Sequence, residues 1–391
     1  MNWLTPTIPG PRIIPAVALA GALLLGGCAG TDHVAPPAEL TAIDAQFAPV
    51  VEWSADVGAA QPSRLSRLIA ERVEDRIYTV DPDGRIQERD ARTGALRHEV
   101  ELDLDGESVV SGIAASEDLL VVGTSDGRVL AIEPGGSTPR WEATLTTAAA
   151  APAVIAGGQV IVRAGDGRIF ALDEADGRRV WVDGRKVPPL ALQGQSRPLA
   201  GVDAVIVGHD NGLLVAHALD DGRVLWENQI ALPRGRTDID RMVDIDARPL
   251  FLDGIVYALA FQGNLAAIDV RSGRTLWSRE LSGFDNFTGD AQALYITDAE
   301  GVIHAIDRRS GDKYWQQDAL NNRFLTGPVR IGAWLAVADF EGYVHFLSPE
   351  TGALVARVRT KARDVVSPLV GDDKALYVLG RDGTLVRVGL P

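Results

Sequence analysis

Apolar and polar residues alternate in short runs along most of this chain, and turn residues separate the runs. In GNLAAIDVRSGRTLW, which begins at Gly263, the second and fourth residues after the glycine are apolar, an Asp stands at the sixth position and a second Gly at the tenth. Such alternation predicts a β-strand with one buried face. The Asp-x-x-x-Gly that follows predicts a turn, because Gly tolerates a positive φ and Asp bonds to nearby backbone. The pattern therefore predicts short strands joined by tight turns.

Relatives of this string recur throughout the chain. GRIFALDEADGRRVW begins at Gly167 and GVIHAIDRRSGDKYW at Gly301. Every copy opens with a glycine that follows a polar residue, and these leading glycines are Gly84, Gly127, Gly167, Gly212, Gly263, Gly301, Gly342 and Gly383. Another β-rich run precedes each leading glycine, and a further one ends in an aromatic residue. One copy is therefore expected to form a sheet of about four antiparallel strands, which buries both of its faces only against neighbouring copies.

The two ends of the chain predict how the copies close into a ring. The eighth copy, ALYVLGRDGTLVRVGLP, stops at Pro391 without its final strand. VVEWSADVG, at residues 50–58, resembles the strand that ends the fifth copy and supplies Trp53 as the missing aromatic residue. An N-terminal strand that completes the C-terminal blade removes both open edges. We therefore expect an all-β fold, an eight-bladed β-propeller with four-stranded blades over residues 50–391.

Most tryptophans share one position in the repeat. Six of the eight fall at or within one residue of it: Trp53, Trp141, Trp181, Trp226, Trp277 and Trp315. Such rings bury a large apolar area and are expected to wedge between adjacent blades. An aromatic cage for a ligand is the alternative, but regular spacing favours packing. His98 and Ala356 replace the tryptophan in the first and seventh copies.

The N-terminal residues carry a different pattern. IIPAVALAGALLL, from Ile13 to Leu25, has the length of a signal-peptide core and is too short to span a bilayer. Leu25-Gly26-Gly27-Cys28 resembles the bacterial lipobox, in which a peptidase cuts before the Cys and its thiol is lipidated; an ordinary secretory signal is the alternative. Ala29, in place of Asp, suggests sorting to the outer membrane. We interpret residues 1–27 as a lipoprotein signal peptide and residues 28–49, rich in Ala and Pro, as a flexible tether.

Composition limits the chemistry that the chain can perform. Its net charge of −15 argues against nucleic acid or an anionic membrane surface as the main partner. Cys28 is the only Cys, so no intramolecular disulfide forms. The six histidines show no metal-ligand spacing, and alternation predicts that His304 and His345 lie on the surface. DIDRMVDID, at 238–246, lacks the Gly and terminal Glu of a calcium loop. We expect no enzymatic activity, no cofactor and no metal.

The longest interval between leading glycines lies between the fourth and fifth copies, and the excess is in ENQIALPRGRTDIDRMVDIDARP at 227–249. Insertions between repeats project from one face of a propeller and often bind partners. Asp244 and Asp246, close to Arg241, are candidates to accept hydrogen bonds from a partner's Arg. Leu190 and Leu192 form a candidate apolar pair on the preceding loop. The alternative is that the aspartates cap turns and that the leucines belong to a strand.

Beyond the single repeat, the chain resembles two groups of propellers. The repeat is similar to that of pyrroloquinoline-quinone enzymes, which are eight-bladed. Nearly the whole chain, from lipobox and tether to blades and end-to-end closure, resembles the BamB family of lipoproteins in the outer-membrane β-barrel assembly machinery. PLALQGQSRP, at 189–198, and TDIDRMVDIDARP, at 237–249, resemble signatures of that family in loops that bind the periplasmic POTRA domains of BamA. The resemblance implies that the partner-binding residues are Leu190, Leu192, Gln193, Arg241, Asp244 and Asp246. Gln193 stands where the family commonly carries Arg, which puts one ionic contact in doubt.

The resemblance to the BamB family implies a function. It is that of a non-catalytic scaffold, monomeric within a hetero-oligomeric complex and held by lipid on the periplasmic face of the outer membrane. There it would bind BamA and assist the folding and insertion of outer-membrane proteins. Transient pairing of blade edges with unfolded barrel strands is a further expectation. The alternative is a periplasmic quinone-binding or sensor propeller, although a quinoprotein dehydrogenase would be expected to show a vicinal Cys pair, a Ca²⁺ site and a catalytic Asp.

Overall fold

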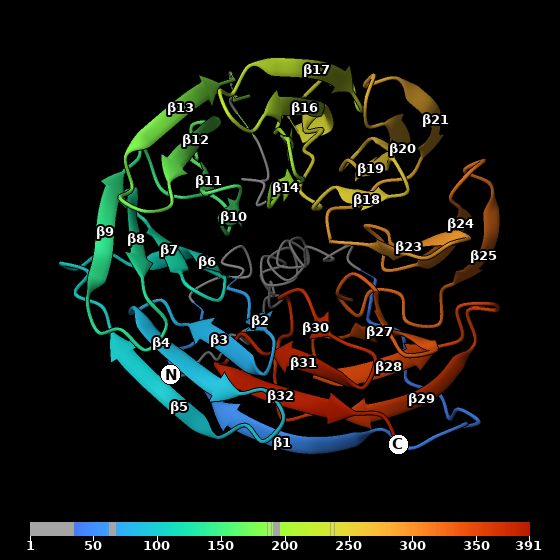
Figure 1. The fold of residues 1–391 in the computed structure, drawn as a ribbon. Coiled ribbons are helices and arrows are strands. Elements are labelled where there is room, and N and C mark those ends of the chain that lie inside the picture. The colour runs from blue at the N-terminus through green and yellow to red at the C-terminus, as the bar shows by residue number, and fades with distance from the viewer. Residues whose placement is uncertain are drawn as a thin grey trace, which may run out of the picture. The chain divides into compact units, whose positions relative to one another are not determined.

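The computed structural model describes residues 35–61, 68–185, 187, 188, 190, 196–234, 236, 237 and 239–391. Residues from Pro37 to Pro391 belong to one compact unit. Within it, eight four-stranded antiparallel sheets are arranged as a ring, which Figure 1 shows along its axis. The first strand of each blade lies near the centre and the last at the rim (Figure 1). The predicted eight-bladed propeller is confirmed.

The first four blades follow one another along the chain. Blade 1 contains β2 (Glu71–Val73), β3 (Arg76–Val80), β4 (Arg85–Asp90) and β5 (Leu96–Glu101). Blade 2 contains β6 (Val109–Ala115), β7 (Leu120–Thr124), β8 (Arg128–Ile132) and β9 (Pro139–Thr144). Blade 3 contains β10 (Val154–Ala156), β11 (Gln159–Arg163), β12 (Arg168–Asp173) and β13 (Arg179–Gly184). Blade 4 contains β14 (Leu199–Ala200), β15 (Ala204–Gly208), β16 (Leu213–Ala218) and β17 (Val224–Gln229).

The remaining blades complete the ring. A 3-10 helix, η1 (Ile239–Arg241), precedes blade 5, which contains β18 (Leu250–Leu252), β19 (Ile255–Leu259), β20 (Asn264–Asp269) and β21 (Thr275–Glu280). Blade 6 contains β22 (Thr288–Gly289), β23 (Ala293–Thr297), β24 (Ile303–Asp307) and β25 (Lys313–Gln317). Blade 7 contains β26 (Val329–Ile331), β27 (Trp334–Ala338), β28 (Tyr343–Leu347) and β29 (Leu354–Arg359). Blade 8 contains β30 (Val370–Gly371), β31 (Ala375–Leu379), β32 (Thr384–Gly389) and β1 (Val50–Asp56).

The N-terminal strand closes the ring as the sequence predicts. β1 pairs antiparallel with β32, and Trp53 stands opposite Arg387 in the register. Glu52 and Arg387 form an ion pair across the two strands. Trp53 also reaches blade 1, where its indole Nε1 donates to the carbonyl of Arg92 at 3.1 Å. Both termini of the propeller are thus held in one sheet.

The second and third strands of the blades are largely buried on both faces, because a neighbouring blade covers each side. All five residues of β23 and of β31 are buried, whereas β1 at the rim alternates between exposed and half-buried positions. The expectation of one buried face therefore fails for the second and third strands of the blades. The surface prediction for His304 and His345 fails for the same reason: the two residues are only 7% and 0% exposed.

Each of these histidines has a carboxylate partner inside the ring. His304 Nε2 lies 2.7 Å from Asp298 Oδ2, and His345 Nε2 lies 3.0 Å from Asp339 Oδ2. Arg357 Nε donates to His345 Nδ1 at 3.0 Å, which assigns that nitrogen as the acceptor. Burial lowers the pKa of His345 in spite of the opposing effect of Asp339. In blades 6 and 7, each histidine on the third strand is therefore linked by a buried contact to the Asp that directly follows the second strand.

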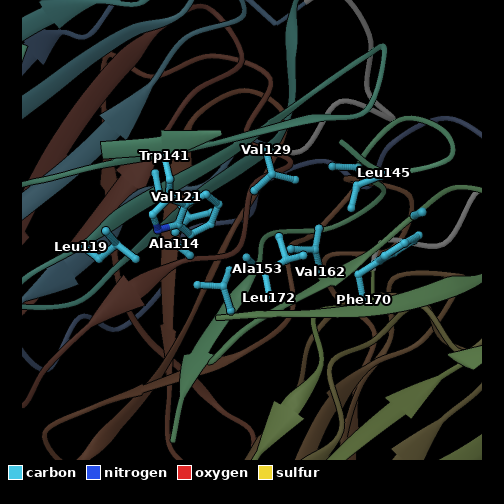
Figure 2. Close-up of a cluster of buried hydrophobic side chains, with 14 residues drawn as sticks. Ala114, Leu119, Val121, Val129, Trp141, Leu145, Ala153, Val162, Phe170 and Leu172 are labelled. Carbon is cyan, nitrogen blue, oxygen red and sulfur yellow. The ribbon is translucent and has the colours of Figure 1, made fainter. Parts of the chain in front are cut away.

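The repeated tryptophans wedge between blades as predicted. Trp141 of blade 2 packs with residues of blade 3, including Phe170 and Leu172, in the apolar cluster of Figure 2. Its Nε1 donates to the carbonyl of Glu174 at 2.9 Å. The same bond to the following blade is made by Trp53, Trp181, Trp226, Trp277 and Trp315. His98, which replaces the tryptophan in blade 1, lies with Nε2 3.2 Å from the carbonyl oxygen of Gly136 in blade 2.

The second glycine of the repeat has a role beyond its turn. Gly273 has a φ of 69°, and a Cβ added there would lie 2.6 Å from the Cγ of Trp226. The tryptophan of one blade thus lies directly against the turn of the next. Equivalent contacts with the preceding blade's tryptophan occur at Gly94, Gly177, Gly222, Gly311 and Gly352. A side chain at this position would disturb both the turn and the interface between the blades.

Part of the segment assigned to the tether packs on the propeller. Ala38 N donates to the carbonyl of Asn321 at 3.0 Å, and Gln46 N donates to that of Val355 at 2.8 Å. Phe47 stacks on Trp334 with ring centroids 5.2 Å apart, and Leu40 packs against the core of blades 6 and 7. We call residues 38–47 the N-terminal strap. The tether prediction was drawn from the Ala and Pro content of the segment, which gives no indication that Leu40 and Phe47 pack on the propeller.

Candidate interaction face

The two loops singled out in the sequence lie on one face of the ring. Each joins the outermost strand of one blade to the innermost strand of the next, and each starts over the turn that carries the leading glycine. Val187 and the Arg185 carbonyl lie against Gly167. The Ala231 and Val243 carbonyls lie against Gly212. Both loops therefore share the face that the leading-glycine turns form.

A buried hydrogen bond joins the two loops. Ser196 at the end of the first loop donates its hydroxyl to the carbonyl of Ala247 at 3.1 Å, and the Ser196 side chain is fully buried. The second loop is also fixed to the turns of blades 4 and 5, because Ile245 N donates to His209 O and Phe261 N to Asp244 O. Neighbouring loops on this face are thus held at a defined spacing.

The structure divides the predicted partner-binding residues into separate groups. Leu190 is 41% exposed, as its assignment to a loop requires. Arg241, at the end of η1, is also exposed. Leu192 and Gln193 lie outside the described residues. Sequence reasoning missed Leu232 and Ile239, which are 58% and 62% exposed on the second loop. The available signal was their apolar character within an otherwise polar insertion.

The aspartates of the second loop do not share one environment. Asp244 is 0% exposed, so it has no surface with which to meet a partner's Arg, and the expectation that it faces a partner is corrected. The path of the loop over the turns of two blades directs this side chain inward. Asp246 is half-buried and lines the central cavity. Asp240 accepts hydrogen bonds from the backbone N of Arg236 and Thr237, which matches the turn-capping alternative. Its bonds with Thr237 lower the pKa of the Asp240 carboxyl.

A buried polar cluster lies between blades 3 and 4. Arg163, at the end of β11, is 1% exposed and pairs with Asp210 in the leading-glycine turn of blade 4. His209 beside them is buried as well, and desolvation lowers its pKa well below the usual range, with Arg163 adding to the effect. His209 is therefore neutral near neutral pH. Its carbonyl accepts the hydrogen bond from Ile245 N described above, so a backbone hydrogen bond links the cluster to the second loop.

A central cavity of about 320 Å³ is lined by the first strands of blades 1, 7 and 8 and by the connections that enter blades 3 to 6. Arg197 crosses it to bind Glu71, with Nη1 2.8 Å from Oε2, and its Nε donates to the carbonyl of Ala153. Arg248 also lines the cavity. Desolvation at the cavity wall lowers the pKa of Arg248, and the nearby charge of Arg197 lowers it further. The centre of the ring is thus polar and is crossed by an ion pair between blade 1 and the loop that enters blade 4.

The described residues do not match the cofactor site of the resembling quinoproteins. No group of three or more His, Cys, Asp or Glu side chains in the described part of the chain is placed to hold a metal ion. The sequence contains one Cys, so a vicinal Cys pair against a quinone is absent. Nor does any helix among the residues that the structure describes have the length and apolar character needed to cross a membrane.

The fold defines the class: a closed eight-bladed propeller built from repeats similar to those of quinoproteins. The model of the family described as "Outer membrane protein assembly factor BamB" matches residues 82–317 and 299–389. The chain belongs to this BamB family. Its members are named as assembly factors and not as enzymes, in agreement with the prediction of a non-catalytic protein.

Individual relatives agree with this assignment along the whole chain. The outer membrane protein assembly factor BamB of Bordetella pertussis is 34% identical over 97% of this chain and 98% of its own length. The crystal structure of BamB from Moraxella catarrhalis covers 86% of this chain and 100% of its own, with a TM-score of 0.77 and 28% identity. Quinohemoprotein alcohol dehydrogenase from Comamonas testosteroni, at 12% identity and a TM-score of 0.67, covers 87% of this chain and 76% of its own and shares the fold alone.

Proposed function

We propose that this protein is a non-catalytic scaffold in outer-membrane protein assembly, and that its loop-bearing face binds the POTRA domains of BamA. Membership of the BamB family supports the general role. The observation that carries the specific role is the pair of loops that Ser196 joins, since it presents Leu190, Leu232 and Ile239 to solvent on a rigid frame. Exposed apolar side chains with a charged rim form the energetic centre of many protein interfaces.

We propose that the exposed residues of the two loops carry the contact. Leu190, Ile239 and Arg241 are available on the surface, whereas Asp244 serves the loop from inside. Asp246 would act at the wall of the central cavity. Leu192 and Gln193 remain proposed contacts by family resemblance. Lipidation of Cys28 would hold the protein on the periplasmic face of the outer membrane, and extended strands of unfolded barrel proteins would pair transiently with blade edges.

A pull-down tests the proposal. The tagged, mature lipoprotein is purified from its host envelope in detergent, and co-purifying proteins are identified by mass spectrometry. The test variant is Leu190→Arg/Ile239→Arg, and the matched control is Val202→Arg/Leu276→Arg, which changes two exposed apolar residues away from the loops. We expect BamA to accompany the parent and the control but not the test variant. Retention of BamA by a folded test variant would reject this face, and its absence from the parent would reject the partner.

A further inference from the structure

The connection that follows β29 places three basic side chains on the surface of an acidic protein. Arg359, Lys361 and Arg363 are exposed, although the chain has a net charge of −15. They line an open surface cavity of about 600 Å³ at the boundary of blades 7 and 8, together with Glu341, Thr360 and Asp382. This connection leaves an outermost strand, so the cavity opens on the loop-bearing face, half a ring away from the loops around blade 4 (Figure 1).

The acidic residues nearby already have partners. Glu341 binds Arg323, and Asp364 binds Arg381 at 2.7 Å. Asp382 Oδ1 accepts hydrogen bonds from the backbone N of Arg363 and Thr384. Among the described residues, no carboxylate forms an ion pair with Arg359, Lys361 or Arg363. The Arg359 guanidinium instead lies 5.3 Å from the ring centre of Tyr343, which holds it at the cavity. Three positive charges thus line the cavity beside two carboxylates, and neither carboxylate forms an ion pair with them among the described residues.

The N-terminal strap begins beside this cavity. Arg323, which binds the cavity residue Glu341, also donates from Nη1 to the carbonyl of Ala38 at 2.9 Å. Ala38 stands ten residues after Cys28 in the sequence. Because a chain spans at most about 3.6 Å per residue, a lipid on Cys28 would lie within about 36 Å of this point. This step rests on the lipid anchoring proposed above.

We propose that Arg359, Lys361 and Arg363 bind the phosphate of an anionic phospholipid headgroup in the leaflet that holds the anchor. Guanidinium groups bind phosphate oxygens in pairs, and an ammonium adds a point charge. Basic residues close to a lipid anchor supply the second attachment that a membrane-bound protein needs for a fixed orientation. The bound headgroup would turn blades 7 and 8 toward the membrane and leave the loops around blade 4 accessible to a protein partner.

Native mass spectrometry of the mature protein in a neutral detergent tests this site. The protein is titrated separately with phosphatidylglycerol, phosphatidylethanolamine, inorganic phosphate and a short polyglutamate peptide. The test variant is Arg359→Gln/Lys361→Gln/Arg363→Gln. The matched control is Arg271→Gln/Arg274→Gln/Arg309→Gln, which removes the same charge from exposed turns on the other face. The mass of the N-terminal residue reports lipidation of Cys28 in the same spectra.

We expect the parent and the control to bind phosphatidylglycerol about tenfold more tightly than the test variant does, since the variant loses three charge-assisted contacts. We also expect them to bind phosphatidylglycerol about tenfold more tightly than they bind phosphatidylethanolamine. Equal binding by the test variant, or an equal loss in the control, would overturn the site. Tighter binding of inorganic phosphate would identify a free anion as the ligand, and tighter binding of polyglutamate would identify an acidic protein segment; either result overturns the lipid. An unlipidated Cys28 with intact headgroup binding would reject the anchor alone, so the two failures are distinguishable.

Discussion

The contact between Gly273 and Trp226 allows the energy of one blade interface to be measured. Gly273→Ala introduces a Cβ at 2.6 Å from Trp226 Cγ, where backbone φ is 69°. Gly254→Ala, in the same blade, places a Cβ at a φ of 82° with nothing within 4 Å. The control therefore shares the backbone strain of the test variant and lacks its steric contact. Both variants add the same methyl group to the chain.

The expected magnitudes follow from these two environments. A left-handed conformation costs an alanine about 1 kcal/mol, which is all that Gly254→Ala should lose. Trp226 cannot move aside freely, because its Nε1 donates to the Val270 carbonyl at 2.8 Å and its side chain is buried. Overpacking of this kind adds about 1–3 kcal/mol, so Gly273→Ala should lose about 2–4 kcal/mol in all.

Equilibrium urea unfolding, followed by near-ultraviolet circular dichroism, measures both variants against the parent. A double-mutant cycle then assigns the difference. Trp226→Ala alone should cost about 3–5 kcal/mol, and in that background Gly273→Ala should lose no more than Gly254→Ala does. Equal losses for the two single variants, or an extra loss at Gly273 that persists without the tryptophan, would refute the account of this glycine as a contact for Trp226.

Three further predictions concern closure, pH and the strap. Trp53→Ala should cost about 3 kcal/mol but Trp53→Phe only about 1, because the latter loses just the bond to Arg92 O; equal midpoints in urea would contradict this. Burial lowers the pKa values of His209, His217 and His345 below 6.5. Below that pH the unfolded chain binds more protons than the folded protein. The contribution of these histidines to stability is therefore complete above about pH 7 and falls as the pH drops below about 6.5. Thermal unfolding from pH 7.5 to 5.5 should show a decline in Tm that is shallower in His209→Gln, and parallel curves would exclude His209. Phe47→Ala should accelerate amide exchange in residues 38–47 whereas exposed Asp44→Ala should not, and unchanged exchange in both would show that Phe47 does not hold the strap.

Repeat spacing was sufficient to predict the ring, because every copy contributes the same four strands and six of the eight contribute the tryptophan wedge. The burial of His345 was not predictable from alternation, which identifies two faces of a strand but not that a neighbouring blade covers each one. The strap was missed because Leu40 and Phe47 are separated by residues typical of a linker. In the candidate site, acidic spacing singled out the loop from the sequence. It could not show that Asp244 turns inward, since this depends on hydrogen bonds of Ile245 and Asp244 to two different blades.

The two glycines of the repeat, both present in six of the eight blades, explain how a rigid ring and a variable loop-bearing face coexist. The second glycine lies against tryptophan and fixes the blade interface. The leading glycine fixes the start of the next connection: Ile230 N donates to Gly212 O and Thr360 N to Gly342 O, and carbonyls of the same connections lie against both glycines. Between this start and its later hydrogen bonds to the glycine turns, a connection carries side chains that the blades do not cover. The loop of blade 4 is therefore free to carry Leu232 and Ile239, and that of blade 7 to carry Lys361 and Arg363, without a change in the blades that support them.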